Sequence, residues 1–324
     1  MTMISAWVCG AISLAAAVAT SNPPHATPPA PLPEYTASTS VSGRIVSAGS
    51  STTTALLEDL GTAFSRIHPG VTFDFSTGGS STAPPTLAAG RSQLAPMSRP
   101  MSAQEKADFE KTRGFPPLEF RIAIDALGVF VHPDNPVERL SNQQLLSIFG
   151  DMPLSETAQT WGDVGVESPE SWRTRPIVPL IPMPTQGSYG VMREDLLRGG
   201  RYRVDAVPAV VASELIQGVA ADRESIGFVS LFYRTPRVKL VAVEDQNGVP
   251  RLPTPEACAD GSYPFARYLY VYVAAKSGDV SPPALAEFLR FATSRQGQAI
   301  VVKEGFTPLP AAIAAPQQAL IRGK

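Results

Sequence analysis

Gly43-Arg44-Ile45-Val46-Ser47-Ala48-Gly49-Ser50-Ser51-Thr52-Thr53-Thr54 is the stretch that decides the fold. Its first seven residues predict a short strand. The helical spacing of the apolar residues that follow predicts a helix from Thr54 to Ile67, which His68-Pro69-Gly70 ends. A strand that passes through a hydroxyl-rich loop into a helix is the repeating unit of an α/β protein with a mostly parallel sheet.

Two more clusters of Ser, Thr and Gly stand at the same kind of position. Thr77-Gly78-Gly79-Ser80-Ser81-Thr82 follows the alternating residues 71–75, a predicted strand, and precedes Pro84-Pro85, which suits a helix start. Thr185-Gln186-Gly187-Ser188 follows the apolar run 176–181 and precedes a predicted helix from Tyr189 to Leu197. Each cluster therefore lies beyond the carboxyl end of a strand, where α/β proteins bind their ligands.

These helix starts indicate a binding chemistry. A helix start offers unpaired N–H groups and the positive end of a dipole, so several starts directed at one spot would hold an anion with little formal positive charge nearby. The alternative is that the hydroxyl residues are ordinary N-caps, for which Ser and Thr are common. One cluster alone would favour capping, whereas three in matching positions favour binding.

Composition and missing motifs exclude several classes of protein. The 324 residues suffice for two domains, and the formal charge of −2 argues against a nucleic-acid surface. Gly-x-Ser-x-Gly, Ser-x-x-Lys and Gly-x-x-x-x-Gly-Lys-Ser/Thr do not occur, and the three His residues show no metal-ligand spacing. We therefore expect no enzyme, no metal and no cofactor, and a secreted hydrolase of phosphate esters is the weakest of the alternatives kept open.

The start of the chain predicts export. Residues 1–19 are apolar and uncharged and end in Ala17-Val18-Ala19, a small-x-small cleavage site, so they predict a signal peptide; an uncleaved N-terminal anchor is the alternative. Residues 20–40 are rich in Pro and predict an extended linker. We expect the mature protein in the periplasm or outside the cell, with Cys258 as its single cysteine.

Two long β-rich stretches divide the rest. Residues 120–132 and 268–274 are long enough to cross between domains and return. This predicts lobe 1 from residues 41–126 and 268–324 and lobe 2 from residues 127–267. Each lobe would be a mostly parallel sheet flanked by helices, with a ligand cleft between the lobes and a hinge behind it.

The order of motifs resembles the phosphate-binding proteins of ABC transporters, the periplasmic PstS-like family. The similarity covers residues 43–315 and rests on the first two clusters and on segments that include Ala95-Pro96-Met97-Ser98-Arg99-Pro100-Met101, LGVFVHPDNP at 127–136, SIGF at 225–228, YPFARYLY at 263–270 and GFTPLP at 305–310. The resemblance implies a type II-like two-lobe binding fold that closes on phosphate, works as a monomer and delivers its ligand to an inner-membrane ABC permease. It assigns ligand contacts to Ser50, Ser51, Thr52, Gly79, Ser80, Ser81, Ser98, Arg99, Gln186, Gly187 and Ser188.

The third cluster departs from the family pattern. The family carries an Arg several residues before Ser-Gly-Thr, but here the stretch is Ile181-Pro182-Met183-Pro184-Thr185-Gln186-Gly187-Ser188. Gln186 can still donate a hydrogen bond, but a bidentate guanidinium contact is lost. We expect Arg99 to balance the charge of the anion and the site to accept sulfate as well as phosphate. A binding protein that has left transport for envelope sensing or an adaptor role is the alternative function.

Overall fold

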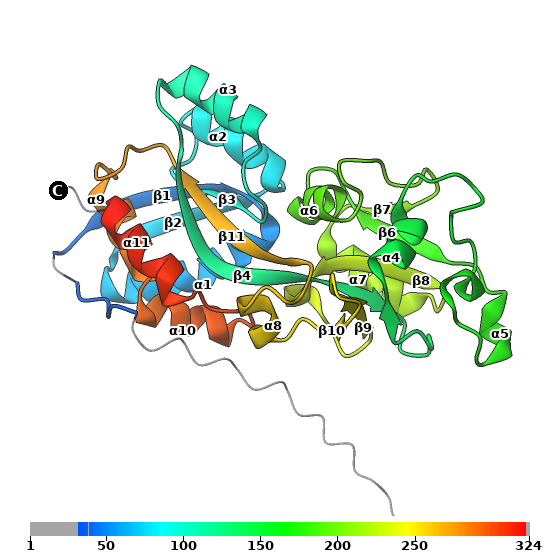
Figure 1. Ribbon diagram of the computed structural model, residues 1–324. Coiled ribbons are helices and arrows are strands. Elements are labelled where there is room, and N and C mark those ends of the chain that lie inside the picture. Colours follow the sequence, from blue (N-terminus) through cyan, green and yellow to red (C-terminus); the bar gives the residue numbers. More distant parts are fainter. Residues whose placement is uncertain (1–31, 38, 322–324) are drawn as a thin grey trace, which may run out of the picture.

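Two lobes lie side by side and are joined by extended strands (Figure 1). This computed structural model describes residues 32–37 and 39–321. The predicted signal peptide and most of the predicted linker lie outside the described residues. No helix in the part of the chain that the structure describes is long and apolar enough to cross a membrane.

Lobe 1 is built on the strand that opened the sequence analysis. Strand β1 (Ser42–Gly49) runs parallel to β2 (Gly70–Thr77), with α1 (Ser51–Ile67) as the crossover. Strand β3 (Ala95–Met97) pairs with β11 (Ala266–Val273), which also pairs with the first part of β4 (Leu118–Val131). The flanking helices are α2 (Ala83–Ala88), α3 (Ala103–Arg113), α9 (Pro283–Ala292), α10 (Arg295–Lys303) and α11 (Ala311–Ile321).

Lobe 2 continues from the second part of β4. This part pairs with β8 (Ser225–Ser230) and β9 (Lys239–Glu244), while β6 (Val178–Pro182) lies parallel to β8 and to β7 (Val207–Ala209). Its main helices are α4 (Asn142–Phe149), α6 (Gly187–Asp195) and α7 (Ala212–Ala221). Shorter elements are β5 (Arg139–Leu140), α5 (Glu170–Arg173), β10 (Pro250–Arg251) and α8 (Pro255–Ala259).

The expectation of a mostly parallel sheet in each lobe needs a correction, because the sheets are mixed. Strand β4 pairs antiparallel with β8, β9 and β11, whereas the pair β1–β2 and the group β8–β6–β7 are parallel. The reason is the connection between the lobes. The chain crosses in β4 and returns in β11 beside it, and a strand that returns next to its predecessor runs antiparallel to it.

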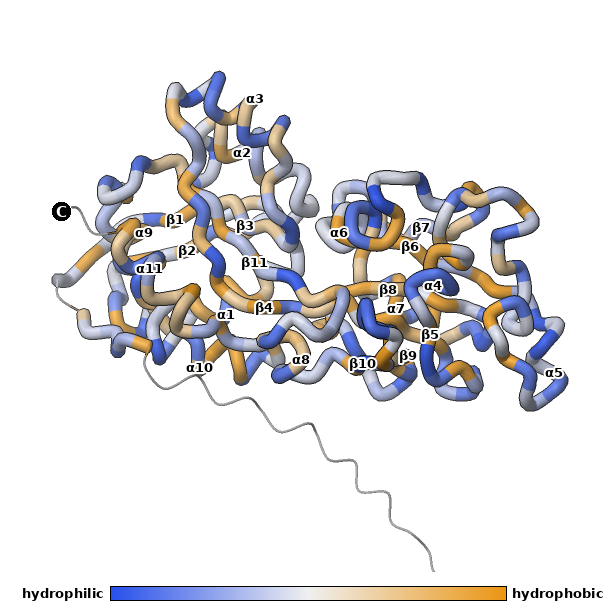
Figure 2. Tube along the Cα trace, viewed as in Figure 1, coloured by the Kyte–Doolittle hydropathy of each residue, from blue (hydrophilic) through white to orange (hydrophobic). Residues whose placement is uncertain are grey.

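Strand β4 links the two cores. Its partner changes from β11 to β8 between Ala126 and Leu127. Next to this point Asp125 is buried and accepts hydrogen bonds from Arg267 Nη2 at 2.9 Å and Ser230 Oγ at 2.7 Å. Burial raises the pKa of the Asp125 carboxyl, and the Arg267 guanidinium opposes that rise. Figure 2 shows hydrophobic residues along the strands of both lobes, with hydrophilic residues on α3 at the outer tip of lobe 1.

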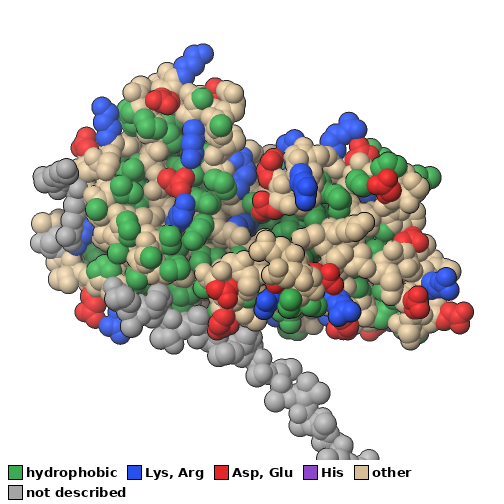
Figure 3. Space-filling view, viewed as in Figure 1, with side chains coloured by type: hydrophobic (Ala, Val, Ile, Leu, Met, Phe, Trp, Pro, Cys, Tyr) green, Lys and Arg blue, Asp and Glu red, His purple; other side chains and the backbone are tan. Residues whose placement is uncertain are grey.

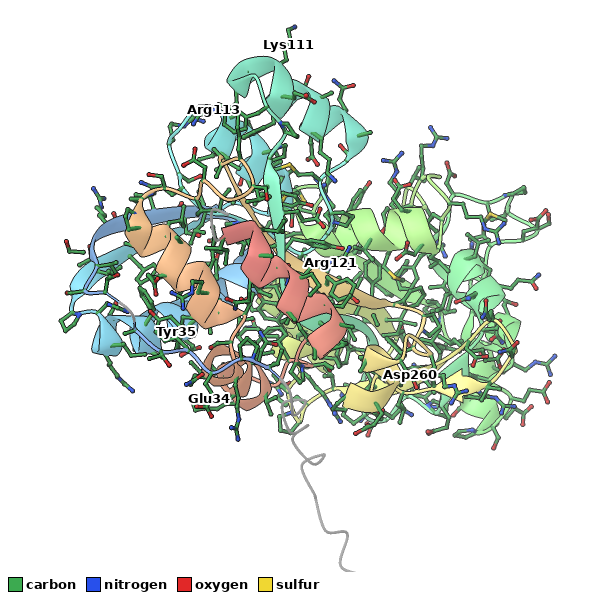
Figure 4. The ribbon with its side chains drawn as sticks, turned by 60° about the vertical axis from the view of Figure 1, so that its left-hand side comes forward. Glu34, Tyr35, Lys111, Arg113, Arg121 and Asp260 are labelled. Carbon is green, nitrogen blue, oxygen red and sulfur yellow. The ribbon has the colours of Figure 1, made fainter. Side chains whose placement is uncertain are left out.

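The folded part begins earlier than the sequence indicated. We expected a linker up to residue 40, but residues 32–37 pack on lobe 1, and Tyr35 is only 8% exposed. Its hydroxyl donates to Glu287 Oε2 at 2.8 Å and lies 2.7 Å from His68 Nε2. Figure 4 shows Glu34 and Tyr35 beside α9 and α10. The burial of the Tyr35 ring and the hydrogen bonds of its hydroxyl fix this segment on lobe 1 despite the Pro-rich composition around it.

Candidate functional site

Loops from both lobes meet between them, each at the carboxyl end of a strand. We call the loops 50–52, 79–81, 98–99 and 186–188 the anion cradle. The lobe 1 loops are joined by backbone hydrogen bonds: Gly78 N and Gly79 N both donate to Gly49 O at 3.0 Å, and Ser50 N donates to Pro96 O at 2.8 Å. The cradle therefore rests on the ends of three neighbouring strands.

Two hydroxyls lie at the centre of the cradle. Ser80 and Ser98 are both buried, with their Oγ atoms 3.3 Å apart, and Ser98 N donates to Ser80 Oγ at 3.1 Å. A Ser hydroxyl has one donor and can rotate it toward a new acceptor. The pair can therefore turn toward a bound anion without moving the backbone.

Lobe 2 contacts lobe 1 directly across the cradle. Ser81 N and Ser81 Oγ both donate to Thr185 O, at 3.4 and 3.3 Å, and Ser51 Oγ donates to Gln186 Oε1 at 3.5 Å. Tyr233 OH in turn donates to Ser51 Oγ at 3.4 Å. These distances are at the long end for hydrogen bonds, so the contacts are weak and easily exchanged for a ligand.

Glycines allow this close approach. A Cβ at Gly187 would lie 2.2 Å from Ser98 Oγ and 2.6 Å from Ser80 Oγ. A Cβ at Gly79, where φ is +92°, would lie 2.3 Å from Thr185 O. Gln186 is the N-cap of α6 and makes no capping hydrogen bond through its side chain. The first-turn N–H groups of a helix have no intrahelical partners, and the first turn of α6 lies against the serine pair at Gly187.

The other predicted contact residues lie in the same loops. Ser50 accepts a hydrogen bond from Thr53 N at 3.4 Å. It therefore caps α1, as the alternative interpretation of the hydroxyl residues as ordinary N-caps predicts. Thr52 and Ser188 are buried in the first turns of α1 and α6. The structure therefore brings the serine, threonine and glycine positions of the sequence prediction to one place.

Arg99 forms an ion pair with a carboxylate of its own lobe. Its Nη1 and Nη2 donate to Glu105 Oε2 at 2.7 Å and Oε1 at 2.6 Å, and Nη1 also donates to Pro100 O. Burial acts to raise the pKa of Glu105, but hydrogen bonds from Arg99 and from the Ser102 backbone outweigh it, and the pKa is lowered. The charge of Arg99 is thus paired with a carboxylate inside the protein, and the other donors of the cradle are neutral.

Sequence reasoning missed several residues around the cradle. Thr185 supplies a backbone acceptor, Tyr233 reaches Ser51 from the end of β8, and Glu105 holds Arg99. Only Glu105 carries a readable signal, because Ser102-Ala103-Gln104-Glu105 is a capping-box pattern, and both bonds of that box are present. Nothing in the sequence marks Tyr233, because only folding brings β8 beside the first loop.

The comparisons with known proteins agree with this architecture. A family model described as a PBP superfamily domain matches residues 35–296. The chain is 36% identical over 312 residues to the phosphate-binding protein PstS of Pseudomonas aeruginosa, covering 95% of this chain and 94% of that protein. The chain belongs to the PstS family of this superfamily. It is also 28% identical to protein SphX of Synechococcus elongatus, covering 81% and 77% of the two chains.

Solved structures show the same fold. A substrate-binding protein from Clostridium perfringens, solved with bound phosphate, covers 83% of this chain and all of its own with a TM-score of 0.69 and 22% identity. An ABC-type phosphate transport receptor from Vibrio cholerae reaches a TM-score of 0.65 at 20% identity, covering 82% and 100%. The predicted PstS-like resemblance and the two-lobe α/β fold are confirmed.

Proposed function

We propose that this protein captures inorganic phosphate in the anion cradle by closure of its lobes, for ABC-type uptake. The observation that carries the proposal is the meeting of the Ser80–Ser98 pair with the first turn of α6 across the lobes. Hydrogen bonds to a charged group each contribute about 1.5–3 kcal/mol, so several neutral donors suffice for tight binding. Relatives of the chain are named phosphate-binding proteins.

The same geometry supports a binding role without catalysis. In the described residues, the cradle hydroxyls contact other hydroxyls, backbone groups and the Gln186 amide, and none of these is a base that could activate a nucleophile. The division into lobe 1 (41–126 and 268–324) and lobe 2 (127–267), a monomeric state, export to the periplasm and an inner-membrane permease as partner belong to this proposal.

Isothermal titration of the mature protein with phosphate and with sulfate tests the proposal. We expect saturable phosphate binding that Ser80→Ala weakens at least tenfold. The exposed Ser277→Ala is the matched control and should bind as the wild type does. Absence of binding to either anion at millimolar concentration would refute the capture function.

A sensor or adaptor in the envelope is the second candidate function. The observation that favours it is the absence of an unpaired positive charge in the described cradle: the third loop has no Arg, and Arg99 is paired with Glu105. If the protein serves transport, its phosphate-loaded form should stimulate ATP hydrolysis by the ABC transporter in proteoliposomes, whereas a sensor should bind the anion without that stimulation. Light scattering of the eluted protein tests the monomeric state, and N-terminal sequencing of the exported protein tests signal cleavage.

A further inference from the structure

Helix α6 presents two glycines to lobe 1. Gly187 and Gly190 are three residues apart and therefore lie on the same face of the helix. Gly187 lies against Ser98, as described above, and Gly190 lies against the next residue, Arg99. A Cβ at Gly190 would be 3.0 Å from Arg99 Cδ and 3.4 Å from Arg99 Nε. The aliphatic part of the Arg99 side chain thus packs on α6 at Gly190, which has no side chain there.

Arg99 cannot easily move away from this contact. Both of its terminal nitrogens donate to the Glu105 carboxylate, and the two side chains are only 18% and 21% exposed. Glu105 is itself fixed, since its Oε2 accepts from Ser102 N at 2.8 Å and its own N–H donates to Ser102 Oγ at 3.2 Å. Two parallel charge-assisted hydrogen bonds hold the guanidinium in one orientation.

The contact lies at the edge of the cradle. On one side are the buried Ser98 and Gly187. On the other side is a cavity of about 880 Å³ between the lobes, which Arg99 and Gly190 line together with Tyr189, Arg267 and Tyr270. Figure 3 shows the surface hollowed between the lobes, with positive and negative side chains on its rim. The contact between the Arg99 stem and Gly190 therefore lies between the cradle and an open cavity.

We propose that Arg99 is a positioning residue. Its side chain seals the cradle against α6 and so retains the anion without touching it, while Glu105 holds the Arg99 guanidinium in place. The inference rests on the proposed capture function and deepens it. It assigns to Arg99 an effect on anion dissociation, in place of the charge-balancing role that the sequence suggested. A seal made only in the closed form acts mainly on the dissociation rate, because residues that exclude water stabilise the bound state.

Gly190→Ala is the first test. The added methyl group meets the fixed Arg99 stem only when the lobes are closed, so we expect phosphate binding about tenfold or more weaker, through faster dissociation measured by stopped flow. Alanine is the better helix former, so the melting temperature of the anion-free protein should stay equal or rise. A lowered melting temperature with unchanged dissociation would overturn the inference. In the Arg99→Ala background, Gly190→Ala should weaken phosphate binding much less than it does in the wild type. The difference measures the coupling between the two positions.

Glu105→Gln is the second test, with Asp108→Asn on the exposed side of α3 as the matched control. Gln keeps the capping pattern but loses the ion pair, so a loosened seal predicts faster phosphate dissociation, with the control unchanged. If Arg99 instead contacted the anion, the freed guanidinium would tighten binding, which is the opposite sign and would overturn the inference. Wild-type protein that binds neither phosphate nor sulfate would overturn the proposed function itself, whereas wild-type binding with an unaffected Gly190→Ala overturns the inference alone.

Discussion

Gly79→Ala should damage the protein in two separable ways. Gly79 has φ +92° and ψ 163°, a region that is almost exclusive to glycine, so a side chain there costs about 1–3 kcal/mol of folding free energy whether the lobes are open or closed. In this structure, where the two lobes touch, its Cβ would also lie 2.3 Å from Thr185 O and 2.7 Å from Thr185 C. These are backbone atoms of the other lobe and cannot rotate away, so closure should cost about 1–3 kcal/mol more.

The assay compares urea unfolding with phosphate titration. Gly114→Ala is the matched control: Gly114 has φ +77° and its Cβ would meet nothing within 4 Å. The control should lose about 1–2 kcal/mol of stability and keep its affinity. Gly79→Ala should lose stability and also bind phosphate about 5- to 150-fold more weakly, at 1.4 kcal/mol per tenfold change. Equal affinity of the two variants would show that Thr185 does not approach Gly79 in the bound state and would refute the reasoning.

Further predictions concern the fold around the cradle. Tyr35→Phe should lower the free energy of unfolding by about 1–3 kcal/mol in urea titrations, because His68 loses a buried partner. Asp125→Ala should cost about 3–5 kcal/mol in the same assay by leaving Arg267 buried without its counter-charge; a loss below 1 kcal/mol would contradict this. The lowered pKa of Glu105 means that its ionised form stabilises the fold fully above about pH 4.3 and less as the pH falls through the folded-state pKa. The stability difference between wild type and Glu105→Gln should therefore shrink only below that pH.

Local patterns predicted much of the fold. The apolar spacing of residues 54–67 and the alternation of residues 71–75 correspond to α1 and β2, because both patterns report which face of an element is buried. The hydroxyl clusters were expected at the ends of strands, and the structure has them there. The sequence could not show that β11 returns beside β4, so the mixed sheet was missed.

By itself, the sequence determined where the hydroxyl and glycine clusters stand, at the start of a helix after a strand, because Ser, Thr and Gly at a helix start have a chemistry that does not depend on distant partners. Only the tertiary structure decided what Arg99 is paired with. The family resemblance assigned Arg99 to the anion, and folding places the Glu105 carboxylate within reach of its guanidinium. The same holds for Gly190, whose missing side chain matters only because lobe 1 comes within van der Waals contact of α6.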